Sequence, residues 1–141
     1  MASKSAKLNA LTSVPLFSDC SKRELGHIVK VSRTIEVEPG TVIVDQGQMG
    51  AEAFIILEGE VTVRRGGRKI ASLGIGDVVG ELSLLDHGPR TASVVADGDA
   101  KLLVLAQNEF RDVLHQHPSI AFKLLGTLAE RIREFDRKYY G

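Results

Sequence analysis

The stretch "GELSLLDHGPRTASVV", residues 80–95, places a carboxylate and a guanidinium among residues that otherwise have the character of a protein core. Glu81 stands at the start of a short apolar turn, and Arg90 follows a Gly-Pro reversal at the head of a strand-like run. Either the two side chains form a structural salt bridge, or they bind a group that is not protein. The surrounding residues bear on this choice.

The local chemistry of the stretch favours a ligand that carries a phosphate. Gly80 lets the backbone turn sharply, and "ELSLLD" is long enough for a little over one helical turn. The first amides of such a turn lack partners within it and form a cradle for an anion. An arginine suits phosphate because its planar fork bonds two oxygens at once. Glu81 would repel a phosphate but can accept a hydrogen bond from a ribose hydroxyl, so the stretch indicates a nucleotide.

Short strands and turns surround this stretch from Arg33 onward. Turn signals such as "EPG", "DQG", "EGE" and "GIGD" alternate with β-branched runs such as "TVIV", "AFIIL" and "VTV". This spacing is typical of an all-β sandwich or barrel. Gly66 and Gly67 predict a two-residue hairpin turn between two of the strands.

Helical patterns flank the β region. "SDCSKRELGHIVKVS" predicts a helix with Ser21 as N-cap and Glu24 completing a capping box. A second helix is expected at "NEFRDVLHQH", and Pro118 separates it from an amphipathic third helix over residues 119–138. The expected fold is α+β and mainly β: a jelly-roll barrel with an N-terminal helix, a short phosphate-binding helix and two C-terminal helices. Residues 1–14 are expected to form a flexible segment.

Composition excludes several classes of function. The 141 residues suffice for one domain, and 18 basic residues balance 18 acidic ones. This balance argues against nucleic acid or a membrane surface held by bulk electrostatics. The single cysteine, Cys20, can form neither an internal disulfide nor a paired-cysteine metal site. No apolar run approaches the roughly 20 residues of a membrane span, and no secretory signal is evident, so a cytoplasmic location is expected.

Residues 80–95 resemble the phosphate-binding cassette of cyclic nucleotide-binding domains, the modules of bacterial catabolite regulators, cyclic-nucleotide-dependent kinases and gated channels. "VPLFSDCSKRELGHI" resembles the entry helix of that family, and "LGIGDVVGE" resembles its lead into the cassette. "EPGTVIVDQGQMGAEAFIILEGEVTV" resembles its first strands. The resemblance implies one cyclic nucleotide-binding domain over residues 15–141, with residues 119–138 as a lid helix.

The resemblance also assigns roles to the cassette residues. Glu81 would bind the ribose 2′-hydroxyl, with Gly80 beside it. The backbone amides of Leu82 and Ser83 would meet the cyclic phosphate, and Arg90 would pair with its charge.

Base recognition would involve Thr91 and the last helix. The Thr91 amide would join Arg90 in binding the phosphate. The expected ligand is cAMP, and the Thr91 hydroxyl, which can bond guanine, makes cGMP the second candidate. Leu128 and Ile132 are the expected apolar covers of the base. Arg131 or Arg133 would stack on the purine or bond its edge, with solvated helix charges as the alternative.

A metal-dependent enzyme of the jelly-roll type would need clustered histidine and carboxylate ligands on strands. His115 and His117 are two residues apart on a predicted helix and do not share a face. His27 falls on another helix and His87 in a loop. No serine or cysteine has a recognisable catalytic partner, so neither an enzyme nor a metal site is expected.

The expected function is a regulatory sensor that binds a cyclic purine nucleotide and relays occupancy through its C-terminal helix to a downstream protein. The alternative is an interaction or dimerisation domain of the same fold without a nucleotide. The apolar spacing of the last helix suits packing on its own roll or pairing with a second copy as a homodimer. The basic run "RRGGRK", residues 64–69, is interpreted as a solvated hairpin tip because it lacks aromatic residues that would stack nucleic acid bases.

Overall fold

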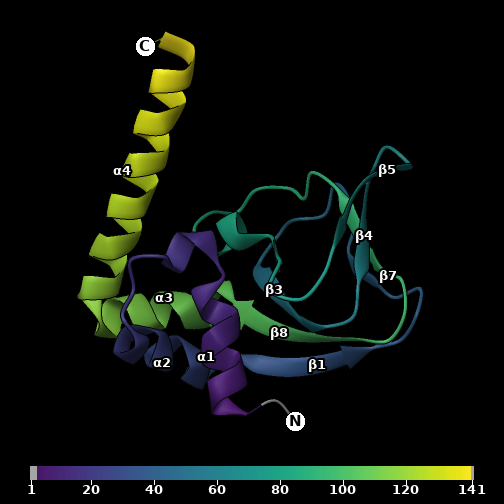
Figure 1. Cartoon of the computed structure of the whole chain (residues 1–141), viewed down its shortest axis with the longest axis horizontal. Coiled ribbons are helices and arrows are strands. Elements are labelled where there is room, and N and C mark those ends of the chain that lie inside the picture. Colours follow the sequence, from purple (N-terminus) through teal and green to yellow (C-terminus); the bar gives the residue numbers. More distant parts are fainter. Residues whose placement is uncertain (1–2, 141) are drawn as a thin grey trace.

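The computed structural model describes residues 3–140, in which a β-roll is joined to a layer of helices (Figure 1). Within these residues the strands form two four-stranded sheets, of order β1-β8-β3-β6 and β2-β7-β4-β5, and every pairing is antiparallel. The strands are β1 (Arg33–Val37), β2 (Val42–Val44), β3 (Glu52–Glu58), β4 (Val61–Arg65), β5 (Arg68–Leu73), β6 (Val78–Val79), β7 (Ser93–Ala96) and β8 (Ala100–Ala106). The helices are α1 (Lys4–Thr12), η1 (Pro15–Phe17), α2 (Lys22–Val31), η2 (Glu81–Leu84), α3 (Gln107–Gln116) and α4 (Pro118–Tyr140). The mainly β fold and its two C-terminal helices are thus confirmed.

The paired strands β3 and β8 separate two hydrophobic cores. Side chains alternate between the faces of a strand, so Phe54 packs inside the roll while its neighbour Ile55 packs against the helices. On β8 the residue paired with Ile55 is Leu103, which also belongs to the helical core. Both strands are therefore nearly continuous apolar runs, because helices cover the face that would otherwise meet water.

The hairpin predicted at Gly66 and Gly67 joins β4 to β5. Both glycines have positive φ, 58° and 80°, and Arg65 pairs with Arg68 across the turn. A left-handed backbone at both turn positions is the geometry that matches the twist of the flanking strands. The hairpin lies at the side of the roll away from the helices (Figure 1).

The capping box predicted at the start of α2 is present. Glu24 N donates to Ser21 Oγ, and the Glu24 side chain accepts from the Ser21 amide at 2.9 Å. The ring of Phe17 in η1 packs against that of Phe110 in α3, with centroids 5.7 Å apart. These contacts hold the helical layer on the outer face of β3 and β8.

The expectation that residues 1–14 form a flexible segment is wrong for the part that the structure describes. Residues Lys4–Thr12 form α1, whose N-cap Ser3 accepts from the Ala6 amide at 3.1 Å. Leu11 and Val14 are buried in the helical core. The helix has little amphipathic periodicity, so the spacing of its apolar residues does not predict it. Tertiary burial of a few apolar side chains is what stabilises such a helix.

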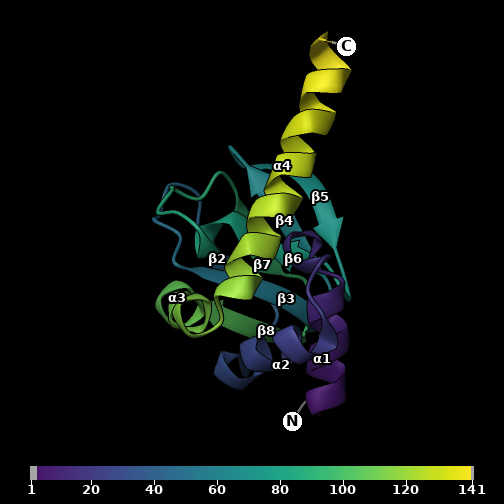
Figure 2. The ribbon, with the colours of Figure 1, turned by 90° about the vertical axis from the view of Figure 1, so that its left-hand side faces the viewer.

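The last helix, α4, packs at its start and projects from the body toward its C-terminal end (Figures 1 and 2). Ile120 and Leu124 are buried in the helical core, and Thr127 Oγ1 donates to Asp19 at 2.9 Å. Lys123 pairs with Glu24 of α2. Across residues 3–140, α4 included, no helix has both the length and the apolar character that a membrane span requires.

Candidate functional site

The cassette segment, defined as residues 80–91, begins where the chain leaves β6 and turns into η2. Gly80 is the N-cap of η2 and has a φ of 73°, in the left-handed region that favours glycine. A Cβ at this position would overlap Nη1 of Arg90 and lie 3.2 Å from the Glu52 carbonyl oxygen. Gly80 is therefore needed for the turn and also for the space that the arginine occupies.

Arg90 is half-buried against the start of the cassette segment. Its Nη1 donates to Ser83 Oγ at 3.1 Å, and its Nη2 donates to the Glu52 carbonyl oxygen at 2.7 Å. Burial lowers the pKa of this guanidinium, and the neighbouring charge of Glu52 acts in the opposite direction. Among the described residues no carboxylate lies within ion-pair distance of Arg90. The protein thus holds the charge in place with neutral oxygens and leaves it without a counterion.

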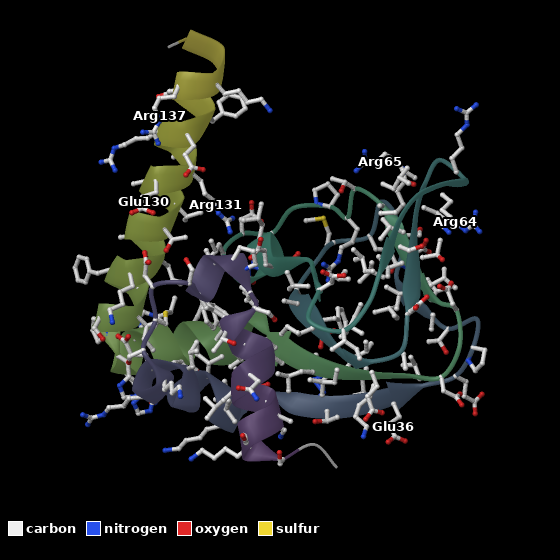
Figure 3. The ribbon with its side chains drawn as sticks, in the orientation of Figure 1. Glu36, Arg64, Arg65, Glu130, Arg131 and Arg137 are labelled. Carbon is white, nitrogen blue, oxygen red and sulfur yellow. The ribbon has the colours of Figure 1, made fainter. Side chains whose placement is uncertain are left out.

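Glu81 does not pair with Arg90, so the structural salt bridge between them is excluded. Its Oε2 accepts from the Leu16 amide of η1 at 3.2 Å, and its Oε1 lies 3.6 Å from Nη1 of Arg131 on α4. Figure 3 shows the Arg131 side chain reaching from α4 toward the roll. The Glu81 side chain retains 19% of its surface exposed and also lines the cavity described below. This carboxylate therefore connects the cassette segment with two helices.

Two residues absent from the sequence-based site complete its support. Gly50 is buried, and a Cβ there would overlap Ser83 Oγ and approach Arg90 Nε to 2.9 Å. Gln107, also buried, donates from Nε2 to the carbonyl oxygens of Ser83 and Asp86 at 3.0 and 2.9 Å. A glycine in a loop and a glutamine at the start of a helix are common sequence features, so neither pattern marked these positions.

A cavity of about 530 Å³ opens between the cassette segment and the wall of the roll. The cassette segment contributes much of the lining, and the facing wall comes from strands of the second sheet and from β6. The lining residues outside the cassette segment are Val44, Val63, Arg65, Leu73, Val78, Val79, Ala92 and Val94. Arg90 and Glu81 thus lie on one side of the cavity, and the facing wall is apolar except for Arg65, which suits a ligand with a charged end and a flat apolar body.

The remaining predicted cassette residues lie at this cavity in different ways. Leu82 and Ser83 both line it, but the Ser83 amide donates to the Gly80 carbonyl oxygen at 2.9 Å within the turn. Thr91 is exposed at the rim, and its carbonyl oxygen accepts from Arg65 Nε at 3.0 Å. The structure therefore brings together Gly80, Glu81, Leu82, Ser83, Arg90 and Thr91 around one opening.

The four residues expected in a lid do not line the cavity. Leu128 packs against the helical core, Arg131 pairs with Glu81, and Ile132 is 63% exposed. Arg133 is exposed on α4. In this structure α4 projects away from the roll, and its Arg131 pairs with Glu81 of the cassette segment.

All residues of the basic run 64–69 are exposed, as expected for a solvated hairpin tip, but one of its arginines also lines the cavity. Arg64 is exposed and does not line the cavity, whereas Arg65 does. Alternation along β4 places the two arginines on opposite faces. The register of β4 in its sheet decides which of the two arginines lies at the cavity, and residue composition does not reveal that register.

The histidines lie outside this site. His27 and His117 stack with ring centroids 3.7 Å apart beside the junction of α3 and α4. Burial, followed by the proximity of His117, lowers the pKa of His27. Over residues 3–140 no group of three or more His, Cys, Asp or Glu side chains is placed to hold a metal ion.

Comparison with known proteins agrees with this arrangement. A family described as "Cyclic nucleotide-binding domain" matches residues 34–117. The cyclic AMP receptor protein of Thermus thermophilus is 35% identical over 127 residues, which are 86% of this chain and 59% of that relative. A cAMP-dependent protein kinase regulatory subunit of Mycosarcoma maydis is 37% identical over 139 residues, covering 93% of this chain and 25% of that relative. The chain therefore spans less than two thirds of the length of these relatives.

A solved structure shares the fold closely. The N-terminal domain of a transcriptional regulator from Streptomyces coelicolor A3(2) superposes with a TM-score of 0.84 at 29% identity, covering 91% of this chain and 95% of that one. The family match, residues 34–117, includes the whole cassette segment. From its roll, its cassette segment and these relatives, the chain belongs to the cyclic nucleotide-binding domain family.

Proposed function

We propose that the chain binds cAMP or cGMP in the 530 Å³ cavity, as a regulatory sensor. The observation that carries this proposal is Arg90, a half-buried cation without a carboxylate partner among the described residues. A charge taken out of water is costly unless it is paired. A phosphate at the cavity wall supplies the missing partner, and a bidentate contact fits the guanidinium fork.

The other cassette residues take the remaining parts of the ligand. Glu81 accepts a hydrogen bond from the ribose 2′-hydroxyl beside Gly80, and the amides of Leu82, Ser83 and Thr91 face the phosphate. The Ser83 amide, which donates to the Gly80 carbonyl oxygen, exchanges that partner for a phosphate oxygen. The apolar wall that includes Val63 and Leu73 receives the base.

Occupancy is relayed to α4 through Glu81. This carboxylate contacts Arg131 at 3.6 Å, so a ribose hydroxyl that bonds it changes the contact between the cassette segment and α4. A ligand shifts a conformational equilibrium only through contacts that differ between the two states. Leu84 of η2 is buried in the helical core, which gives the cassette segment a second link to the helices. Leu128, Ile132 and Arg133 then move with α4 as the helix closes over the base.

A homodimer through α4 is a second candidate property. Phe122 and Leu125 are 72% and 61% exposed on the part of α4 that packs against the body. Large exposed apolar side chains three residues apart favour burial against another helix. Sedimentation of the purified chain tests this candidate: Phe122→Ser is expected to shift a dimer to monomer, whereas Ile70→Ser, at an exposed position on β5, leaves the sedimentation coefficient unchanged.

Calorimetric titration of the full chain with cAMP and with cGMP tests the proposed function. Saturable binding of at least one nucleotide at one site per chain is expected, with 5′-AMP as the control that lacks the cyclic phosphate. Binding of neither cyclic nucleotide by folded protein would contradict the proposal and favour an interaction domain of the same fold.

A further inference from the structure

Arg65 is the one charged or hydrogen-bonding side chain on the described wall of the cavity outside the cassette segment. The other lining residues there are Val44, Val63, Leu73, Val78, Val79, Ala92 and Val94, which are all apolar. If a ligand held by its phosphate at Arg90 lays its base on this wall, Arg65 is the side chain there that can hydrogen-bond the edge of the base.

The position of Arg65 follows from the register of β4. Side chains of a strand alternate between its faces, and Val61, Val63 and Arg65 occupy one face. Val61 is fully buried in the roll, Val63 packs against the same core, and both Val63 and Arg65 line the cavity. Figure 3 shows the side chains of Arg64 and Arg65 leaving the end of β4 in different directions.

A backbone contact orients the guanidinium of Arg65 and leaves part of it available. Its Nε donates to the Thr91 carbonyl oxygen at 3.0 Å, which ties the side chain to the cassette segment. Among the described residues Nη1 and Nη2 of Arg65 have no hydrogen bond or ion pair. Two parallel donors thus remain available at the rim of the cavity.

We infer that Arg65 reads the base and favours guanine over adenine. This inference rests on the proposed function and deepens it. Guanine presents two acceptors, O6 and N7, on one edge, and arginine bonds both at once. Adenine presents the N7 acceptor beside the N6 amino group, which is a donor, so one arm of the fork meets no acceptor. Arg65 therefore raises the ratio of cGMP affinity to cAMP affinity, whichever nucleotide the chain binds more tightly.

Calorimetry with both nucleotides on four proteins tests this inference: the wild type, Arg65→Ala, Arg65→Lys and Arg64→Ala. Arg65→Ala is expected to weaken cGMP binding by roughly 5- to 150-fold, the discrimination of one bidentate pair, and to leave cAMP binding nearly unchanged. Arg65→Lys keeps the charge but lacks the planar fork, so it does not restore cGMP binding. Arg64→Ala, one residue away and outside the cavity, is the matched control and binds both nucleotides like the wild type.

A nucleotide analogue isolates the atom involved. In 7-deaza-cGMP a carbon replaces the N7 acceptor. Wild-type protein is expected to bind this analogue more weakly than cGMP, whereas Arg65→Ala binds the two equally well.

The outcomes separate this inference from the function on which it rests. Two results would overturn the inference: equal losses of cGMP and cAMP affinity in Arg65→Ala, or recovery of cGMP affinity in Arg65→Lys. Either would mean that Arg65 acts on the phosphate or only on the Thr91 backbone. Unchanged binding of both nucleotides in Arg65→Ala would overturn it as well. Wild-type protein that binds neither nucleotide would overturn the proposed function itself.

Discussion

A phosphate bound beside Arg90 would meet a charge that the protein leaves without a carboxylate. The guanidinium is fixed by Ser83 Oγ and by the Glu52 carbonyl oxygen, both neutral acceptors. Such acceptors hold the geometry without neutralising the charge. At the scale of single residues the site is therefore preorganised for an anion, and two glycines, Gly50 and Gly80, provide the space that the arginine needs.

Replacement of Arg90 by alanine is expected to remove most nucleotide affinity. Loss of one partner of a desolvated charge pair costs about 3–5 kcal/mol, which corresponds to roughly two to four decades in Kd. Titration calorimetry measures the loss, and circular dichroism confirms that the variant remains folded. Wild-type affinity in folded Arg90→Ala protein would contradict the assignment of the phosphate site.

Gly50→Ala is expected to weaken both binding and stability. Its Cβ overlaps Ser83 Oγ, and the side chains of Ser83 and Arg90 must shift to admit it. Overpacking of this kind costs about 1–3 kcal/mol of folding free energy, and a displaced arginine binds phosphate less well. Urea unfolding and calorimetry measure the two effects.

The matched control is Gly26→Ala in α2, where a new Cβ meets nothing within 4 Å. It is expected to raise stability by about 0.5–1 kcal/mol, because alanine favours helix over glycine. Equal stability of the two alanine variants would show that Gly50 does not shape the arginine site.

At the scale of the secondary-structure elements, an ion pair between Lys123 and Glu24 links α4 to α2. Glu24 accepts from Lys123 and from Ser119 Oγ of α4 while it caps α2 through Ser21. The hydrogen bond from Lys123, followed by that from the Ser21 amide, lowers the pKa of Glu24 from its ordinary 4.5 to about 2. The ionised carboxylate therefore stabilises the N-terminal half of α4 in its docked position.

The free energy of unfolding is expected to decrease at low pH as the Glu24 carboxylate becomes protonated. Because the pKa of Glu24 is lower in the folded state, the unfolded chain binds more protons between pH 4.5 and about 2. The stabilisation is therefore fully present above pH 4.5 and is lost as the pH falls toward 2. Urea unfolding at a series of pH values measures this loss.

Glu24→Gln provides the control, because its amide oxygen can still accept from the Ser21 amide but the side chain no longer titrates. The variant is expected to be less stable than the wild type at pH 6, with a shallower loss of stability below pH 4.5. Parallel pH profiles for the two proteins would exclude Glu24 as the group responsible.

At the scale of the whole molecule, the cassette segment stands between the two hydrophobic cores. Val79 at the end of β6 belongs to the core inside the roll, whereas Leu84 of η2 belongs to the core under the helices. The cavity opens on the roll side, and α4 contacts the cassette segment from the helical side through Arg131. A change in the cassette segment on ligand binding is thus placed to alter the docking of α4.

Hydrogen exchange is expected to detect this relay. Protection of residues 119–138 should rise when the cavity is saturated with cyclic nucleotide, since a helix that projects from the body gains contacts when it closes. In Arg131→Ala the rise should be smaller, because the link to Glu81 is lost. Arg137→Ala, at an exposed position further along the same helix, should behave like the wild type. Identical exchange with and without saturating nucleotide would leave α4 without a role in the relay.

The sequence by itself determined the features that depend on neighbours along the chain. The capping box of α2, the Gly66-Gly67 hairpin and the turn at Gly80 are local devices, and each was predicted where it occurs. The strand pattern and the family resemblance of residues 80–95 likewise identified the roll and the candidate ligand class, because alternation and short motifs are visible in a linear sequence.

Only the tertiary structure decided which distant groups meet. The carbonyl oxygen that holds Arg90 is 38 residues away in sequence, and the amide bonded to Glu81 is 65 residues away. The choice of Arg65 over Arg64 for the cavity required the register of β4, since a shift of one residue would exchange the two faces. The helix α1 has no clear amphipathic pattern, and its burial of Leu11 in the helical core is a tertiary contact. Contacts of this kind depend on how the elements pack together, and the spacing of residues along the chain does not predict them.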